Sequence, residues 1–99
     1  MSGTAIDVRN NIAASRYEVV VDGSVAGFAA YRLHNDVVVF THTEVDPDYE
    51  GRGLGSSLAK GALDDVRSQG GRIQPLCPFI AAYVKRHPEY QELVASDAS

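Results

Sequence analysis

The chain has 99 residues and a mass of 10.6 kDa, enough for one small domain with a single hydrophobic core. The 13 acidic residues outnumber the 9 basic ones, so the formal net charge of -4 favours neither nucleic acid nor an anionic membrane surface. The single cysteine, Cys77, excludes an intramolecular disulfide and the cysteine-rich zinc folds. No signal-peptide pattern follows Met1 and no apolar run could cross a bilayer, so we expect a soluble, cytoplasmic protein.

The first half of the chain predicts antiparallel strands. Runs rich in β-branched and aromatic residues are separated by turn residues, notably Asp22-Gly23, a strong hairpin signal. Strands are expected over residues 16–21, 24–33 and 37–45, with an edge strand over residues 6–8. In the strand over residues 37–45, strict alternation places His42 on the same face as Val38, Phe40 and Glu44.

The second half predicts helices. Apolar residues spaced three and four apart favour an amphipathic helix over residues 54–68, which Gly70-Gly71 would end. Gly61 inside this helix costs about 1 kcal/mol relative to alanine, which suggests that another element approaches it closely. A short strand over residues 72–76 follows. A second helix is expected from Pro78 to about Arg86, and a last one over residues 89–94.

These elements predict one α+β layer spanning residues 1–99, with antiparallel N-terminal strands followed by a helix, a strand and C-terminal helices. The second helix is expected to point four apolar side chains inward: Phe79, Ile80, Tyr83 and Val84.

The segment between the long strand and the first helix carries Gly51, Gly53 and Gly55. Glycines at a helix start let the backbone approach an anion, and the free N–H groups there favour a phosphate or pyrophosphate. A simple turn into the helix explains the glycines equally well. The spacing fits neither a Walker loop nor a Rossmann fingerprint, and Ser57 stands where a calcium loop requires a bidentate glutamate.

The segment from Glu44 to Leu58 resembles the acetyl-CoA pyrophosphate loop of the GNAT superfamily of N-acyltransferases. Gly53 and Gly55 match the pattern Arg/Gln-x-x-Gly-x-Gly/Ala, whereas Glu50 occupies the Arg/Gln position, so cofactor affinity could differ. Together with residues 75–79 and 85–90, the segment is similar to a subgroup of very small, single-domain GNAT proteins that contain a cysteine. The resemblance spans roughly residues 16–94 and implies a GNAT-like mixed sheet and acetyl-CoA as the cofactor.

Cys77 is expected at the N-cap of the second helix, where free N–H groups and the helix dipole favour a thiolate. A small buried apolar residue is the alternative reading. The resemblance implies a cysteine near the acetyl group that carries it as an acyl-cysteine. It also implies that His42 lies close by, as a general base or a residue that orients Cys77; a structural histidine is the alternative.

The resemblance further implies the residues that contact the cofactor. The strand edge at Val45 would pair with the pantetheine arm, and Tyr83 could protonate the CoA thiolate. The backbone of the loop would hold the pyrophosphate through Arg52, Gly53, Leu54, Gly55 and Ser56. Core packing is the alternative for Tyr83. We expect no metal site, because the three histidines are dispersed without other ligands.

The predicted function is an acetyl-CoA-dependent N-acetyltransferase that acts on an amine. A non-catalytic CoA-binding module or sensor is the main alternative. A redox role is disfavoured because no second cysteine can resolve an oxidised thiol, and the acidic balance disfavours a nucleic-acid module. Because the chain is short, a protein partner could complete the substrate site.

Overall fold

The computed structural model describes residues 6–49 and 53–95. Five strands form one sheet in the order β1-β2-β3-β4-β5. The first four are antiparallel in succession: β1 (Ile6–Asn11), β2 (Arg16–Val21), β3 (Ser24–His34) and β4 (Val37–Val45). The last, β5 (Arg72–Pro75), runs parallel to β4. The predicted α+β class with a mixed sheet is therefore confirmed, and the edge strand is longer than expected.

The helices also follow the predicted order. The α-helices are α1 (Leu54–Ser68) and α2 (Pro78–Arg86), and short 3-10 helices are η1 (Ile12–Ala14), η2 (Pro47–Tyr49) and η3 (Pro88–Leu93). Gly70 ends α1 with a φ of 73°, in the left-handed region that glycine adopts without strain. Among the described residues, no helix combines the length and the apolar composition needed to cross a membrane.

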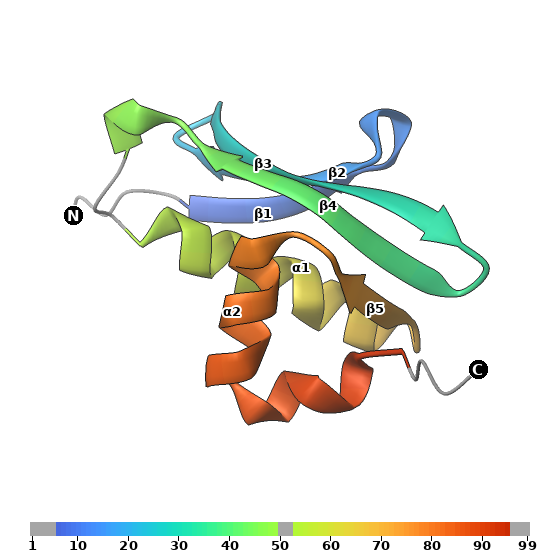
Figure 1. Cartoon of the computed structure of the whole chain (residues 1–99). Coiled ribbons are helices and arrows are strands. Elements are labelled where there is room, and N and C mark those ends of the chain that lie inside the picture. Colours follow the sequence, from blue (N-terminus) through green and yellow to red (C-terminus); the bar gives the residue numbers. More distant parts are fainter. Residues whose placement is uncertain (1–5, 50–52, 96–99) are drawn as a thin grey trace.

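Both α-helices pack against one face of the sheet (Figure 1). Side chains from α1, α2 and β2–β5 form a single buried cluster on that side, with Phe40, Leu58 and Ile73 among its fully buried members. We call the opposite side of the sheet the open face, since no helix within the described ranges covers it. Glu18 lies on the open face because its neighbours Tyr17 and Val19 point into the cluster.

A bulge in β4 overturns one expectation about this strand. In the register with β3, Ala30 pairs with His42 and Tyr31 with Phe40, so Thr41 is an extra residue. The extra residue reverses the alternation of side chains. His42 therefore lies on the open face and not, as strict alternation predicted, on the same face as the buried Phe40.

Gly61 lies against β1, as its position inside α1 suggested. A Cβ atom at this glycine would lie 2.7 Å from Cβ of Val8, nearer than non-bonded carbons approach. We expect Gly61→Ala to lower the free energy of unfolding by about 1–3 kcal/mol through overpacking, although alanine favours the helix. The measurement is urea denaturation of the wild type and the variant.

The matched background for this test is Val8→Gly, which removes the Cβ atom and both methyl groups that Gly61 faces. In that background Gly61→Ala should be neutral or stabilising by up to about 1 kcal/mol, the intrinsic helix preference of alanine. An equal cost in both backgrounds would contradict close packing of α1 against β1.

Glu18 is a buried charge on the open face, with a side chain that is 2% exposed. Its carboxylate accepts hydrogen bonds from Asn11 Nδ2 at 3.0 Å, Arg16 Nε at 2.9 Å and Arg9 Nε at 3.2 Å. The bond from Asn11, helped by the two arginines, lowers the pKa of Glu18 despite its burial. This carboxylate therefore connects β1 to β2 in its ionised form.

Because the pKa of Glu18 is lowered on folding, its charge stabilises the protein at neutral pH. This contribution is lost as the pH falls from about 4.3, the usual value for glutamate, through the folded pKa. We expect Glu18→Gln to cost about 1.5–3 kcal/mol at pH 7 and progressively less in acid. Urea denaturation of both proteins between about pH 7 and pH 3 measures this; a constant difference would contradict the ionised state.

Candidate functional site

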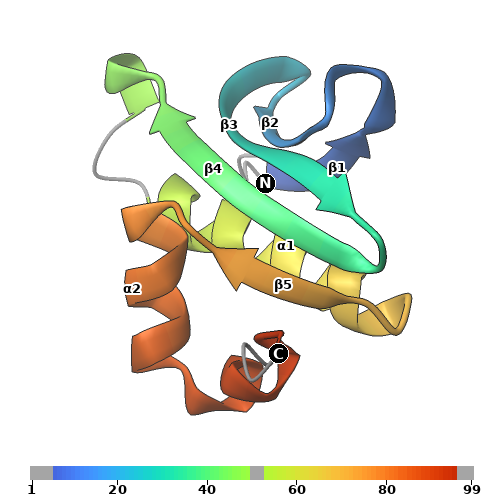
Figure 2. The same ribbon diagram turned by 45° about the vertical axis from the view of Figure 1, so that its right-hand side comes forward.

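The site begins where β4 and β5 separate. The parallel pairing ends at Phe40 and Pro75, and the backbone N–H groups of Leu76 and Cys77 both donate to the Phe40 carbonyl, at 3.1 and 2.9 Å. Beyond this point β4 continues alone, as Figure 2 shows. The strand therefore has an edge that β5 does not cover.

The backbone direction along this edge follows from the pairing with β3. Asp46 N donates to Ala26 O at 2.7 Å, so the backbone groups of Asp46 point toward β3. Every second residue of a strand shares this direction, so the backbone groups of Glu44 and His42 also point toward β3. The N–H and C=O groups of Thr43 and Val45 consequently point away from β3, toward the gap between the strands. An extended ligand with amide groups could pair with them as an added strand would.

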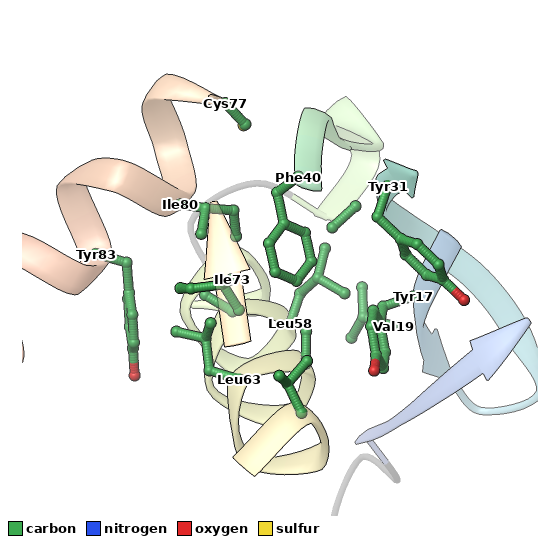
Figure 3. Close-up of a cluster of buried hydrophobic side chains, with 14 of the residues drawn as sticks. Tyr17, Val19, Tyr31, Phe40, Leu58, Leu63, Ile73, Cys77, Ile80 and Tyr83 are labelled. Carbon is green, nitrogen blue, oxygen red and sulfur yellow. The ribbon is translucent and has the colours of Figure 1, made fainter. Parts of the chain in front are cut away.

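Cys77 lies at the closed end of this gap. It is the N-cap of α2, as predicted, and its side chain is only 3% exposed. Its Sγ atom lies 3.1 Å from Oγ1 of Thr43. Figure 3 shows Cys77 at the margin of the buried cluster, beyond Phe40 and Ile80. Thr43 could not be identified from the sequence, because only the bulge places it on this face.

The other end of the gap meets the start of α1. Gly53, with a φ of 71°, is the N-cap of this helix, and its carbonyl accepts the first helical hydrogen bond, from Ser57 N at 3.0 Å. The N–H groups at residues 54–56 therefore have no partner within the helix. We call Gly53–Ser56 the glycine cradle. Its backbone donors and the positive end of the helix dipole suit a pyrophosphate.

A surface groove joins the cradle to the edge of β4. It is lined by Val45, Tyr49, Gly53, Leu54, Gly55, Ser56 and Phe79. The structure thus brings together five of the seven predicted cofactor residues. Arg52, together with Glu50 and Gly51, lies outside the described residues.

The position of Phe79 differs from what the sequence predicted. It was predicted to face inward with Ile80, Tyr83 and Val84, but its side chain is 37% exposed and lines the groove. A Cβ atom on Gly55 would lie 2.7 Å from Cζ of the Phe79 ring. The ring therefore packs on the bare backbone of the cradle. The glycine at position 55 was the only sequence signal for this contact.

His42 lies on the open face, opposite to the face on which Thr43 meets Cys77. Its Nε2 atom is 2.7 Å from Oε2 of Glu44, and its ring centroid is 6.1 Å from that of Phe28. The structure therefore does not place His42 in direct contact with the thiol. Its imidazole is instead available to a molecule that approaches β4 across the open face.

Tyr83 lies apart from the groove lining. Its ring is buried and stacks on His87, with centroids 3.9 Å apart. Burial raises the pKa of Tyr83, so its hydroxyl stays protonated at neutral pH. In Figure 3 this hydroxyl points away from Cys77. The predicted role of Tyr83 as a proton donor would need the CoA sulfur to reach that side.

A separate, mainly apolar cavity of about 280 Å³ lies at the C-terminal end of α1, among Tyr17, Tyr31, Val66 and Gly70. The helix has 15 residues, so this cavity is about 22 Å from the glycine cradle. It is therefore not part of the groove. Within the described ranges, no group of three or more His, Cys, Asp or Glu side chains could hold a metal ion.

Comparison with known proteins identifies the family. The family model described as GCN5-related N-acetyl-transferase matches residues 16–93. Protein NATD1 from Homo sapiens is 42% identical over 57 residues, which are 58% of this chain and 50% of NATD1. Protein NATD1 from Danio rerio is 38% identical over 55 residues, 54% of this chain and 50% of the relative. The chain thus spans about half the length of these relatives.

Solved structures agree on the fold. A GCN5-like protein from Staphylococcus aureus matches 97% of this chain and 92% of its own, with 20% identity and a TM-score of 0.67. The ribosomal-protein-S18-alanine N-acetyltransferase from Escherichia coli is 26% identical, with a TM-score of 0.56 over 61% of this chain and 39% of its own. Because the family model covers the glycine cradle, the free edge of β4 and Cys77, the chain belongs to the GCN5-related N-acetyltransferase family.

Proposed function

We propose that this protein is an acetyl-CoA-dependent N-acetyltransferase that transfers the acetyl group to an amine through an acetyl-cysteine at Cys77. The observation that carries the proposal is the position of Cys77 at the closed end of the gap, with its Sγ atom 3.1 Å from Thr43 Oγ1. The cradle lies at the other end of the same strand edge. The proposed phosphate site and the proposed nucleophile therefore lie along one edge of β4, which supports the proposal.

The residues present fit acetyl-CoA. The free N–H groups of the glycine cradle would hold the pyrophosphate, and the backbone of Thr43 and Val45 would pair with the pantetheine amides. Phe79 would cover the arm from the side of α2. When bound, acetyl-CoA supplies a thioester whose carbonyl carbon is open to nucleophilic attack. Arg52 remains a proposed phosphate contact.

Cys77 would act first. Its sulfur forms a bond to the acetyl carbon while the bond from that carbon to the CoA sulfur breaks, so one thioester replaces another. The thiol proton leaves with the CoA thiol. Thr43 Oγ1 would orient the Cys77 sulfur through their 3.1 Å contact. Tyr83, protonated because of its raised pKa, is proposed to relay this proton: its hydroxyl would donate to the departing thiolate and take up the proton that Cys77 releases.

The second step would use the open face. The amine nitrogen attacks the acetyl carbon, the bond to the Cys77 sulfur breaks, and the amine loses a proton. His42 is the proposed base, because its imidazole lies on the open face and is held by Glu44 at 2.7 Å. In this arrangement the nucleophile and the base work from opposite faces of β4.

Intact mass spectrometry tests the proposal. Incubation with acetyl-CoA should add one acetyl group to the wild type and none to Cys77→Ala, and an added primary amine should discharge it. Ser56→Cys provides a matched control, because Cys77→Ala/Ser56→Cys restores one thiol at the groove without restoring the geometry at Thr43. An unchanged mass of the wild type would refute the intermediate. Binding of acetyl-CoA without any transfer would favour a CoA-binding module.

A further inference from the structure

We infer that the acceptor is an amine that also carries a carboxylate, specifically an amino acid with an apolar side chain, and that Arg32 binds this carboxylate on the open face. The inference rests on the proposed function, since it names the substrate class of that site. It is carried by a pocket lined by Leu76, the residue before Cys77, and by none of the proposed cofactor residues.

This acceptor pocket has a volume of about 240 Å³ and is lined by Arg32, Leu33, His34, Val39, Gln74 and Leu76. The strand register explains how residues from three strands meet there. Arg32 of β3 pairs with Val39 of β4, which pairs with Gln74 of β5, so the three side chains form one row across the sheet. Because Phe40 and Ile73 point into the core, this row lies on the open face.

The acceptor pocket is next to the proposed nucleophile. Leu76 is 56% exposed and lines the pocket, whereas Cys77, the next residue, points into the gap. Consecutive Cα atoms are about 3.8 Å apart, so the pocket wall and the thiol belong to adjacent backbone positions. The parallel pairing ends at Phe40 and Pro75, and beyond the hydrogen bonds from Leu76 and Cys77 to the Phe40 carbonyl the two strands no longer close the sheet. An amine in the pocket could reach the acetyl carbon through this opening.

The charges of the pocket select a carboxylate. Arg32 and His34 are the ionisable residues that line it, and no carboxylate does. Among the described residues, the Arg32 guanidinium has no hydrogen bond or ion pair, so its donors are free for a ligand. A guanidinium binds a carboxylate through two parallel hydrogen bonds.

The apolar residues of the pocket suit the rest of the ligand. Val39 and Leu76 supply an apolar surface beside Arg32, on which an apolar side chain can pack. An amino acid with an apolar side chain therefore matches the pocket better than a simple alkyl amine does.

Two amines that differ only in the carboxylate provide the kinetic test. Leucine should be acetylated with a kcat/KM at least about tenfold above that of isoamylamine, its decarboxylated counterpart. Arg32→Gln should reduce this preference by about ten- to a hundredfold, the effect of a lost charged hydrogen bond. Arg67→Gln, which removes an exposed arginine on α1 with the same change of net charge, should preserve the preference. An equal preference in wild type and Arg32→Gln would overturn the inference.

A binding measurement separates this inference from the proposed function. Titration of the ¹⁵N-labelled protein with leucine should shift the amide signals of Val39, Gln74 and Leu76, and Arg32→Gln should abolish these shifts. The result does not depend on transfer, so it supports the acceptor pocket even if Cys77 is never acetylated. Shifts confined to other regions, or isoamylamine shifts equal to those of leucine, would refute the pocket while leaving the transfer reaction intact.

Discussion

Saturating acetyl-CoA should raise the Tm of the wild-type protein by about 10 °C or more, and Gly55→Val should remove most of this rise. A ligand at a hundred times its Kd stabilises the native state by about 2.7 kcal/mol, and each kcal/mol corresponds to about 4–8 °C in a domain of this size. A side chain at position 55 meets the Phe79 ring, since even Cβ would lie 2.7 Å from it. The ring and the valine together would close the groove.

The control for this prediction is Ser68→Val, which introduces the same side chain at the opposite end of α1. It should change the Tm of the free protein slightly and leave the rise with acetyl-CoA intact, because Ser68 does not line the groove. Differential scanning calorimetry with and without the ligand measures both effects. A full rise in Gly55→Val would show that acetyl-CoA binds elsewhere.

Phe40→Ala should cost about 3–5 kcal/mol of unfolding free energy and lower the Tm by more than about 12 °C. The Phe40 side chain is fully buried and lies between the aromatic rings of β2 and β3 on one side and α2 on the other (Figure 3). Its ring centroid is 6.1 Å from that of Tyr17 and 6.4 Å from that of Tyr31. Removal of the ring would leave a cavity that these rigid neighbours cannot fill.

Phe40→Leu is the matched variant, because it keeps most of the apolar volume and should cost less than about 1.5 kcal/mol. Urea denaturation gives both values. Since a small domain has only about 5–15 kcal/mol in total, Phe40→Ala could remove a large share of its stability. A loss below about 1 kcal/mol would contradict the central position of this ring in the core.

Part of the candidate site lies on the open face of the sheet and is not covered by a helix of the described residues. Both α-helices lie on the far side of the sheet, so the acceptor pocket and His42 face outward. The proposed nucleophile, Cys77, lies at the gap, whereas the proposed base, His42, and Arg32 lie on the open face. In the proposed reaction an acceptor on the open face would therefore not displace acetyl-CoA from the groove.

The sequence alone determined the order and type of the elements, because each depends on local chemistry. Asp22 and Gly23 adopt the positive φ angles, 50° and 87°, that a tight hairpin requires. Apolar spacing placed α1, and the proline after Cys77 placed the start of α2. The glycines at positions 53 and 55 indicated the cradle for the same reason, since a backbone that approaches an anion or a ring needs residues without side chains.

Only the tertiary structure decided which faces the functional side chains occupy. The bulge at Thr41 depends on the register with β3, and it moved His42 to the open face and Thr43 to Cys77. Phe79 points outward, and its ring packs on the backbone of Gly55, which has no side chain to block this contact. Arg32 lines the acceptor pocket because β3, β4 and β5 place Arg32, Val39 and Gln74 side by side in one row. Register and packing between distant segments set these positions, and local sequence patterns do not determine them.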